Sequence, residues 1–271
     1  MNYRHAFHAG NFADLVKHAA LLNLLARMPR PLSVIDTHAG RGLYDLSGEE
    51  AQRSGEAQAG IGQLMQAGDL PAELLALRAA VTRLNGGGPA RLYPGSPLLI
   101  AGALGKGDSY VACELRPEEH SALTQALTPW RNAQAICADG YAEAASRLDR
   151  EGEALVLIDP PFEKSDDYRR CVEALKAITR RSPRAVVMIW LPLKDLETFD
   201  SFVRDAEDAG VGPLLIAEAR MRPLRDPMKM NGCALVLARA PDGMAQTLQS
   251  ICDWTVGALG QGGAARIWTA A

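Results

Sequence analysis

The feature that most constrains the fold is a set of short apolar runs in which apolar and polar residues do not alternate. A run of this length and kind is typical of a β-strand that is covered on both faces of its sheet. Seven such runs lie at residues 32–37, 109–114, 133–138, 154–159, 185–193, 214–220 and 233–240. The sequence therefore predicts a central sheet that is buried on both sides.

Helical stretches separate most of these runs. Their apolar residues recur at helical spacing, and they cover residues 117–127, 141–148, 166–180 and 194–209. A further amphipathic helix at residues 11–25 precedes the first run. Strand alternating with helix predicts a doubly wound α/β fold with a mostly parallel, seven-stranded sheet. Residues 221–232 are too few for a crossover helix, so we expect the last strand to be antiparallel.

A long insertion follows the first strand. In a nucleotide-binding βαβ unit, the acidic residue of the second strand follows the glycine loop by about 20 residues. Here Glu114 follows Gly42 by 72 residues, so about 50 residues are extra. We interpret residues 45–92 as an inserted, mostly helical subdomain, with a helix at 70–84, within a single domain that comprises residues 1–271.

The charge balance argues against binding of nucleic acid by bulk charge alone, because 29 Lys and Arg face 32 Asp and Glu. Hydrophobic residues make up 48% of the chain and charged residues 23%, which excludes a disordered, collagen-like or coiled-coil chain. Basic residues are nevertheless concentrated in residues 1–30 and 220–232, each with four basic residues and one acidic. These two segments predict a phosphate-binding rim, with ordinary surface charge as the alternative.

Targeting and redox features point to a reduced, cytoplasmic protein. The first residues form no apolar signal segment, and the apolar runs are far shorter than the roughly 20 residues that span a bilayer. The five cysteines occur singly, without a CxxC pair. We expect buried, inert thiols at Cys113, Cys137 and Cys233. His, Cys and acidic residues do not cluster at ligand spacing, so no metal site is predicted.

The first strand leads into a glycine loop, Asp36-Thr37-His38-Ala39-Gly40-Arg41-Gly42. Glycines after a strand-end acid allow the backbone to approach a ligand closely, although a tight turn alone would use the same residues. The loop lacks the third glycine of the dinucleotide fingerprint, which disfavours NAD and FAD.

Acidic residues end two further strands, at Glu114 and Asp139. The carboxyl ends of parallel strands are where open α/β sheets bind ligands, and an acid there can accept hydrogen bonds from ribose hydroxyls. Each residue has an alternative: Glu114 as a solvated carboxylate and Asp139 as a helix N-cap.

The sequence Asp159-Pro160-Pro161-Phe162 follows another apolar run. The two prolines remove N–H donors and fix φ, which leaves carbonyl oxygens available beside one carboxylate and one aromatic ring. Such a loop suits an exocyclic amine on a planar base. The alternative is a Pro-Pro turn after a buried strand.

Taken in this order, Asp36 with its glycines, Glu114, Asp139 and Asp159–Phe162 resemble the S-adenosylmethionine-dependent amino-methyltransferases, which carry (Asp/Asn/Ser)-Pro-Pro-(Tyr/Phe). Residues 3–18, the Asp-Thr-His-Ala-Gly loop and the Tyr-Pro-Gly-Ser-Pro segment at 93–97 narrow the resemblance to the RlmJ family of 23S rRNA adenine-N6 methyltransferases. The resemblance extends along essentially the whole chain. This chain has Phe162 where the family often has tyrosine, and Arg41 where a smaller residue is common.

The resemblance implies a Rossmann-like methyltransferase fold and a set of site residues. It places Asp159, Pro160 and Phe162 in catalysis. The implied cofactor contacts are His18, His38, Ser96, Glu114, Asp139, Gly140 and Asp159. On the substrate side it places Tyr3, His5, Lys17 and Phe162.

The resemblance also implies methyl transfer from S-adenosylmethionine, with S-adenosylhomocysteine as product, to N6 of one adenine in 23S rRNA. In the family this is adenine 2030. We expect free or early-assembly rRNA as the partner, no metal, no membrane and a monomer. Three alternatives remain open: a DNA adenine methyltransferase, an enzyme acting on a protein amide, and a non-enzymatic nucleic-acid-binding or DNA-uptake factor.

Overall fold

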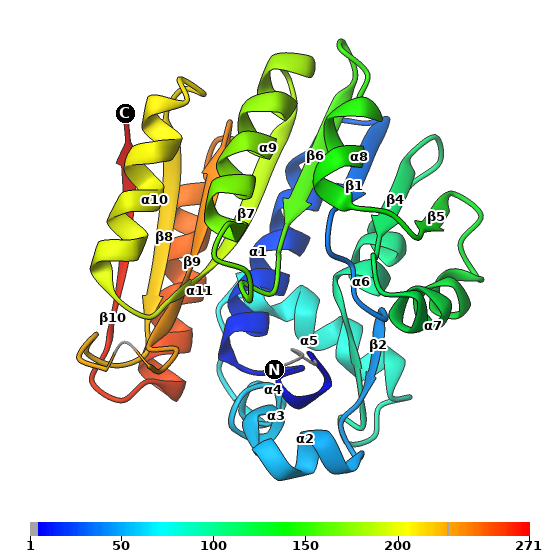
Figure 1. Ribbon diagram of the computed structural model, residues 1–271. Coiled ribbons are helices and arrows are strands. Elements are labelled where there is room, and N and C mark those ends of the chain that lie inside the picture. Colours follow the sequence, from blue (N-terminus) through cyan, green and yellow to red (C-terminus); the bar gives the residue numbers. More distant parts are fainter. Residues whose placement is uncertain (1–4, 227) are drawn as a thin grey trace.

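The computed structural model describes residues 5–226 and 228–271 and shows an α/β fold with one large sheet between two layers of helices (Figure 1). The eight strands of this sheet lie in the order β10-β8-β9-β7-β6-β1-β4-β5. Their bounds are β1 Leu32–Asp36, β4 Ser109–Cys113, β5 Ala133–Ile136, β6 Glu153–Ile158, β7 Val186–Leu193, β8 Leu214–Arg220, β9 Gly232–Ala238 and β10 Ala264–Ala270.

Strand directions agree with the sequence prediction for the first seven strands. β1 pairs in parallel with β4 and with β6. The pairs β4–β5 and β6–β7 are parallel as well. β9 is antiparallel to both β7 and β8. The mostly parallel α/β sheet and its antiparallel last predicted strand are therefore confirmed.

The number of strands was wrong, because the sheet has eight rather than seven. β10 pairs antiparallel with β8 at the sheet edge, after the unpredicted helix α11 (Met244–Leu259). Most residues of β10 are half-buried or exposed. It therefore lacks the unalternated apolar composition that identified the other strands, since one side of an edge strand faces solvent.

The strands bury side chains on both faces. Leu155 and Leu157 of β6 enter one core, and Val156 and Ile158 enter the other. Helices α8 (Gly140–Ser146), α9 (Asp167–Arg181) and α10 (Leu196–Asp208) cover the second core. Helices α1 (Phe12–Arg27), α6 (Ser96–Ala103), α7 (Pro117–Leu127) and α11 cover the first. This two-sided burial explains why the strands read as continuous apolar runs.

Helix α1 carries several residues toward the carboxyl edge of the sheet. It follows the short 3-10 helix η1 (His5–Phe7) and begins after Asn11, whose side chain accepts hydrogen bonds from the backbone N–H groups of Ala13 and Asp14. This is the usual N-cap arrangement. The helix is buried along most of its length and contacts α5, α6 and α11.

The segment between the glycine loop and α6 is mostly helical. It contains α2 (Glu49–Ser54), α3 (Glu56–Ala59), α4 (Ile61–Gln66) and α5 (Ala72–Leu84), framed by the antiparallel pair β2 (Leu43–Asp45) and β3 (Leu92–Pro94). The crossover helix from β1 to β4 is α6, which contacts both strands. The extra residues thus lie between the glycine loop and its crossover helix, and they deliver Ser96 back to the end of β1.

The described residues contain neither a membrane-spanning helix nor a cluster of metal ligands. None of the described helices is long and apolar enough to cross a membrane. Among residues 5–226 and 228–271, no group of three or more His, Cys, Asp or Glu side chains could hold a metal ion.

Candidate active site

A cavity of about 880 Å³ lies at the carboxyl edge of the sheet. Its volume falls within the range of small-molecule sites. The structure brings most of the site residues named from sequence together around it. These are His5, Lys17, His18, His38, Ser96, Glu114, Asp139, Gly140, Asp159, Pro160 and Phe162. Tyr3 lies outside the described residues.

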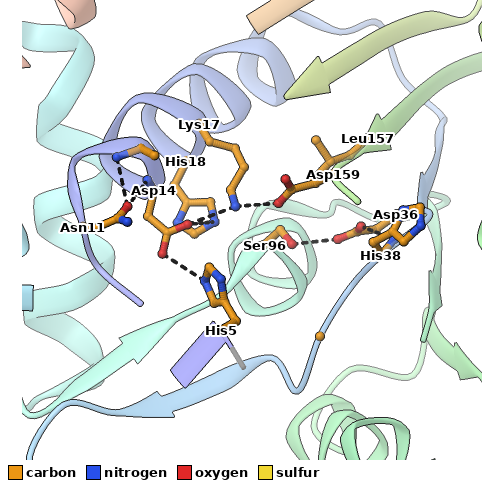
Figure 2. A network of polar contacts seen from close by, with 12 residues as sticks. His5, Asn11, Asp14, Lys17, His18, Asp36, His38, Ser96, Leu157 and Asp159 are labelled. Carbon is orange, nitrogen blue, oxygen red and sulfur yellow. Dashed lines mark hydrogen bonds and ion pairs between the residues drawn. The ribbon is translucent and has the colours of Figure 1, made fainter. Parts of the chain in front are cut away.

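Lys17 and Asp159 form the centre of a polar network in this cavity (Figure 2). The Lys17 Nζ atom lies 2.6 Å from Asp159 Oδ2 and 2.9 Å from Asp14 Oδ1. Burial alone would lower the pKa of Lys17, but the two carboxylates outweigh it and hold the pKa well above its ordinary value. Lys17 is therefore a charged ammonium that fixes one oxygen of Asp159.

Asp14 ties this network to the segment before α1. Its Oδ2 atom accepts hydrogen bonds from the Gly10 backbone N–H at 2.9 Å and from His5 Nε2 at 3.1 Å. Burial acts to raise the pKa of Asp14, but Lys17 and then His5 hold it well below its ordinary value. Asp14 is not among the site residues identified from the sequence. Its only local signal is the three-residue spacing to Lys17 on one helix face.

The end of β1 is held by a buried carboxyl. Asp36 Oδ2 accepts a 2.7 Å hydrogen bond from Ser96 Oγ and a longer one, 3.4 Å, from the Tyr110 hydroxyl. Burial raises the pKa of Asp36 to about 7, against the opposing effect of the Ser96 bond, and the nearby charge of Asp159 adds to the rise. Ser96 is the first residue of α6, and its hydroxyl links that helix to the end of β1.

Histidines 18 and 38 are neutral in this structure. Burial lowers the pKa of each to about 3. His18 Nδ1 lies 2.7 Å from the Tyr93 hydroxyl. His38 Nδ1 lies 2.7 Å from Thr37 Oγ1, which donates its own hydrogen to the Leu157 carbonyl. The His38 Nδ1 must therefore donate, which leaves Nε2 of this neutral ring as an acceptor.

Glu114 extends from the end of β4 toward the glycine loop. Its two carboxylate oxygens accept hydrogen bonds from the backbone N–H groups of Gly40 at 3.0 Å and Arg116 at 2.8 Å. Burial raises its pKa, against the effect of these two bonds. Each oxygen retains a further lone pair, so the carboxylate can also accept from hydroxyl groups of a ligand.

Asp139 has two structural partners beside the cavity. It caps α8 by accepting from the Tyr141 backbone N–H at 3.1 Å, and its Oδ2 atom lies 2.5 Å from Arg170. Burial would raise its pKa, but Arg170 holds the value below its ordinary range. The Arg170 guanidinium also lies 4.3 Å above the centre of the Tyr141 ring. Arg170 is not among the site residues identified from the sequence. It belongs to α9 and pairs with Asp139 only in the folded chain.

The backbone approaches itself closely at Gly140. A Cβ atom there would lie 2.0 Å from the Thr37 carbonyl oxygen, so only glycine fits where α8 begins against the glycine loop. At Gly40, φ is +65° and a Cβ would lie 2.5 Å from the Tyr44 hydroxyl oxygen. Both glycines leave bare backbone next to the cavity.

The Asp159-Pro160-Pro161-Phe162 loop follows β6 directly. Pro160 is buried and Phe162 is half-buried. The Phe162 ring lies 4.7 Å from the Tyr168 ring and 6.0 Å from the Trp190 ring, measured between centroids. Phe162 has φ of +50°, a left-handed conformation that is uncommon for a residue with a side chain and that clusters at functional sites.

The predicted phosphate-binding rim is wrong for its N-terminal part. Lys17 is buried between two carboxylates. Arg27, the last residue of α1, bonds to Thr247, and Arg30 pairs with Asp108. Arg27 lies at the far end of the helix and Arg30 lies beyond it, whereas the cavity is lined by the first two turns. Arg4 lies outside the described residues.

The prediction of a buried thiol at Cys137 is also wrong. Cys113 and Cys233 are buried, as expected, but Cys137 is exposed. It follows the last residue of β5, which is the edge strand of the sheet. Strand order therefore decides its exposure.

The residues present fit S-adenosylmethionine. A carboxylate oriented by two backbone N–H groups, Glu114, can take ribose hydroxyls, and the glycine loop gives the backbone access to the rest of the molecule. The cavity also reaches Asp159, so the cofactor and a second planar group can lie in it together.

Comparison with known proteins agrees with this geometry. Residues 29–270 match the family described as Ribosomal RNA large subunit methyltransferase D, RlmJ. The chain is 33% identical over 260 residues to Ribosomal RNA large subunit methyltransferase J of Escherichia coli K12, and 31% identical over 259 residues to the protein of the same name from Haemophilus influenzae. Each alignment covers 94% of this chain and 92% of the relative.

A solved structure is also similar. Protein LPL1258 of Legionella pneumophila, from the family DUF519, superposes with a TM-score of 0.85 at 26% identity, over 97% of this chain and 98% of that one. The fold and the site define a Rossmann-like, S-adenosylmethionine-dependent methyltransferase. Within that class, the chain belongs to the RlmJ family of ribosomal RNA large subunit methyltransferases.

Proposed function

We propose that this protein transfers a methyl group from S-adenosylmethionine to the N6 amine of one adenine in 23S rRNA, the nucleotide that the family numbers adenine 2030. The two relatives are named as methyltransferases of large-subunit ribosomal RNA. The observation that carries the proposal is the Asp-Pro-Pro-Phe loop, which lies in one cavity with the strand-end acid Glu114.

The cofactor supplies an electrophilic methyl group on a sulfonium. Glu114 would hold its ribose hydroxyls, and Asp139 with Gly140 would meet its adenine ring. Ser96, His18 and His38 line the same cavity and would contact the remainder. Because both histidines are neutral, they add no positive charge beside the sulfonium.

Asp159 would orient the target amine. The N6 lone pair is delocalised into the adenine ring, so the amine is a poor nucleophile. Lys17 holds Asp159 Oδ2, which leaves Oδ1 and the Pro160 carbonyl to accept the two N6–H bonds. That arrangement favours a pyramidal nitrogen and directs its lone pair toward the methyl group. Most of the rate gain would come from orientation and fixed dipoles.

The Asp159 carboxylate would receive the proton after methyl transfer rather than before it. The Lys17 ammonium at 2.6 Å holds this carboxylate in place. A nitrogen that has already gained a methyl group is a much stronger acid than the neutral amine, so a carboxylate suffices to accept its proton. No covalent intermediate is required.

Phe162 would stack on the target base. Stacking of a base on an aromatic side chain is worth about 1–3 kcal/mol, and the base must leave its own stack to enter the cavity. Tyr168 and Trp190 support the Phe162 ring from within the protein. The proposed substrate also places the protein in the cytoplasm.

The test measures incorporation of labelled methyl into protein-free 23S rRNA, assembled large subunits, DNA and a protein fraction. We expect labelled N6-methyladenosine in protein-free rRNA. Label in DNA or protein instead would replace the proposed substrate, and its absence from every fraction would favour a non-enzymatic binding factor. Mapping of the methylated nucleotide in rRNA from a strain that lacks the protein tests the position.

Asp159→Ala tests the mechanism. We expect a loss of methyl transfer of at least 100-fold, a typical contribution of a positioned acid–base group, with cofactor binding retained in calorimetry. The matched control is Asp200→Ala, at an exposed position on α10. Near-normal methylation by Asp159→Ala would exclude the role given to that carboxylate.

A further inference from the structure

A second, smaller cavity lies on the same side of the protein as the candidate active site. Its volume is about 350 Å³. It is lined by the segment that follows β8, the turn before β10 and the first residue of α10. These residues are Leu196, Arg220, Arg222, Pro223, Leu224, Gly262, Gly263 and Ala264.

The charge that is available in this cavity comes mainly from Arg222. Arg220 is paired with the buried carboxylate of Glu218, at 2.5 Å from Nη2 to Oε2. In the described part of the chain, the buried Nε of Arg222 has no hydrogen-bond partner. A buried donor without an acceptor is rare in proteins and needs an explanation.

Three acidic side chains of the segments around this cavity have partners of their own. Asp195 caps α10 through the Thr198 backbone N–H at 2.7 Å. Asp226 lies 3.4 Å from Lys229. Glu218 receives Trp268 as well as Arg220. The Nε–H of Arg222 therefore has no acceptor among the described residues, and an acceptor on a bound molecule would satisfy it.

The position of the cavity relates it to the active site. β8 runs parallel to β6 and β7, so Arg220 lies at the carboxyl edge that also carries Asp159. Three strand spacings separate β6 from β8 in the sheet, or about 14 Å at 4.8 Å per strand. Figure 1 shows the loop after β8 at the lower ends of β8 and β9.

One loop contributes to both cavities. Arg222, Pro223 and Leu224 line the smaller one, whereas Met228 and Met230 line the larger one. In the same way, the turn after β7 contributes Lys194 to the larger cavity and Leu196 to the smaller. The two cavities are therefore lined by neighbouring parts of the same two segments.

We propose that the smaller cavity is a subsite for one backbone phosphate of the RNA strand that flanks the target adenine, held by Arg222 with support from Arg220. The proposal rests on the proposed function. A strand that continues from the target nucleotide carries a phosphate at every nucleotide, so it can present one to this neighbouring cavity. A guanidinium presents several N–H donors in a planar fork, which matches phosphate oxygens.

Arg222→Gln is the test. It removes the charge of a residue without leaving a buried carboxylate unpaired. Arg220 is unsuitable, since its loss would leave Glu218 buried without its closest cation. The matched control is Arg150→Gln. Arg150 is exposed and lies just before β6, at the amino ends of the parallel strands. Equal melting temperatures and equal cofactor affinity establish that both variants are folded.

The measurement is binding of protein-free 23S rRNA at several salt concentrations, together with methylation kinetics. For Arg222→Gln we expect about three- to tenfold weaker binding, a log–log salt slope smaller by about 0.7–0.9, and a raised KM at an unchanged kcat. Arg222→Lys should retain most of the slope. Arg150→Gln should match the unaltered protein.

Binding of Arg222→Gln with the affinity and slope of Arg150→Gln would overturn the subsite. Methylation of rRNA by the unaltered protein tests the proposed function separately. Normal methylation with an unaffected Arg222→Gln variant would remove the subsite alone. Failure of the unaltered protein to methylate any rRNA would remove the proposed function, while the binding comparison would still decide the subsite.

Discussion

Replacement of Lys17 by methionine should cost this protein a large part of its stability. The side chain of Lys17 is 6% exposed, and those of Asp14 and Asp159 are 2% and 17% exposed. Methionine fills a similar volume but removes the cation. Asp14 then lacks its principal counter-charge in a site that water does not reach, whereas Asp159 can draw on solvent in the cavity.

The magnitude follows from these distances. At 2.6 and 2.9 Å, each attraction is about 6 kcal/mol at an effective dielectric constant of 20. Desolvation of the three groups offsets much of that gross value. Removal of one partner from a buried ion pair typically costs about 3–5 kcal/mol. We expect Lys17→Met to lower the free energy of unfolding by that amount at pH 7.

The pH dependence identifies the cause. In the unaltered protein the pKa of Asp14 is held well below its ordinary value. The stabilisation that this carboxylate provides is therefore complete above its ordinary pKa of about 3.9. It is lost only as the pH falls through the lower pKa that Asp14 has in the folded protein. Without Lys17, burial dominates and raises the pKa of Asp14. Protonation then relieves the cost, so the difference between variant and unaltered protein should shrink from pH 7 to pH 5.

Urea unfolding at pH 5, 6 and 7 measures this difference, with Lys176→Met on the exposed face of α9 as control. If the single variant fails to fold, the double variant Lys17→Met with Asp14→Asn should recover most of the loss, because it removes the buried charge as well. A loss below about 1 kcal/mol that does not change with pH would refute the reasoning, since surface substitutions stay within about 0.5 kcal/mol.

Two further predictions concern backbone and thiol positions. Gly140→Ala should lower the free energy of unfolding by at least about 2 kcal/mol and weaken cofactor binding in calorimetry, because the new Cβ would lie 2.0 Å from the Thr37 carbonyl oxygen. The control is Gly257→Ala in α11, where no atom lies within 4 Å of the new Cβ. It should instead raise the free energy of unfolding by about 0.5–1 kcal/mol. Equal behaviour of the two variants would contradict this. In a thiol titration of the folded protein, only Cys137 should react quickly. The other four thiols are buried, and burial raises their pKa. Fast reaction of all five thiols would show that the reagent reaches the interior of the folded protein.

The strands of the sheet and the acidic residues at their carboxyl ends could be predicted from the sequence. Strands with two buried faces are continuous apolar runs, and the acids that follow them must meet at one edge because parallel strands end together. Asp36, Glu114, Asp139 and Asp159 could therefore be assigned to one edge before any coordinates. Their hydrogen-bond partners could not, because Arg170 and Ser96 come from elements elsewhere in the chain.

Lys17 shows the limit most directly. In the sequence it is one of four basic residues in an N-terminal segment, and a solvent-exposed role follows from composition. The structure instead places it against Asp159, 142 residues away, where its charge serves a buried carboxylate. The amphipathic pattern predicted for this helix would leave its polar face exposed. In the structure α1 is buried on most of its surface, and Asp14, Lys17 and His18 are buried with the apolar residues.

The contact between α1 and α11 has a consequence for how the protein is made. α1 leaves the ribosome early, but α11, which packs against it, begins more than 200 residues later. At 5–20 residues per second, translation of that interval takes about 10–40 s, during which α1 can contact α5 and α6 but lacks its third helical partner. We expect truncation within α11 to destabilise the packing of α1, which carries Lys17, and so to lower activity even though α11 contributes no residue to the cavity.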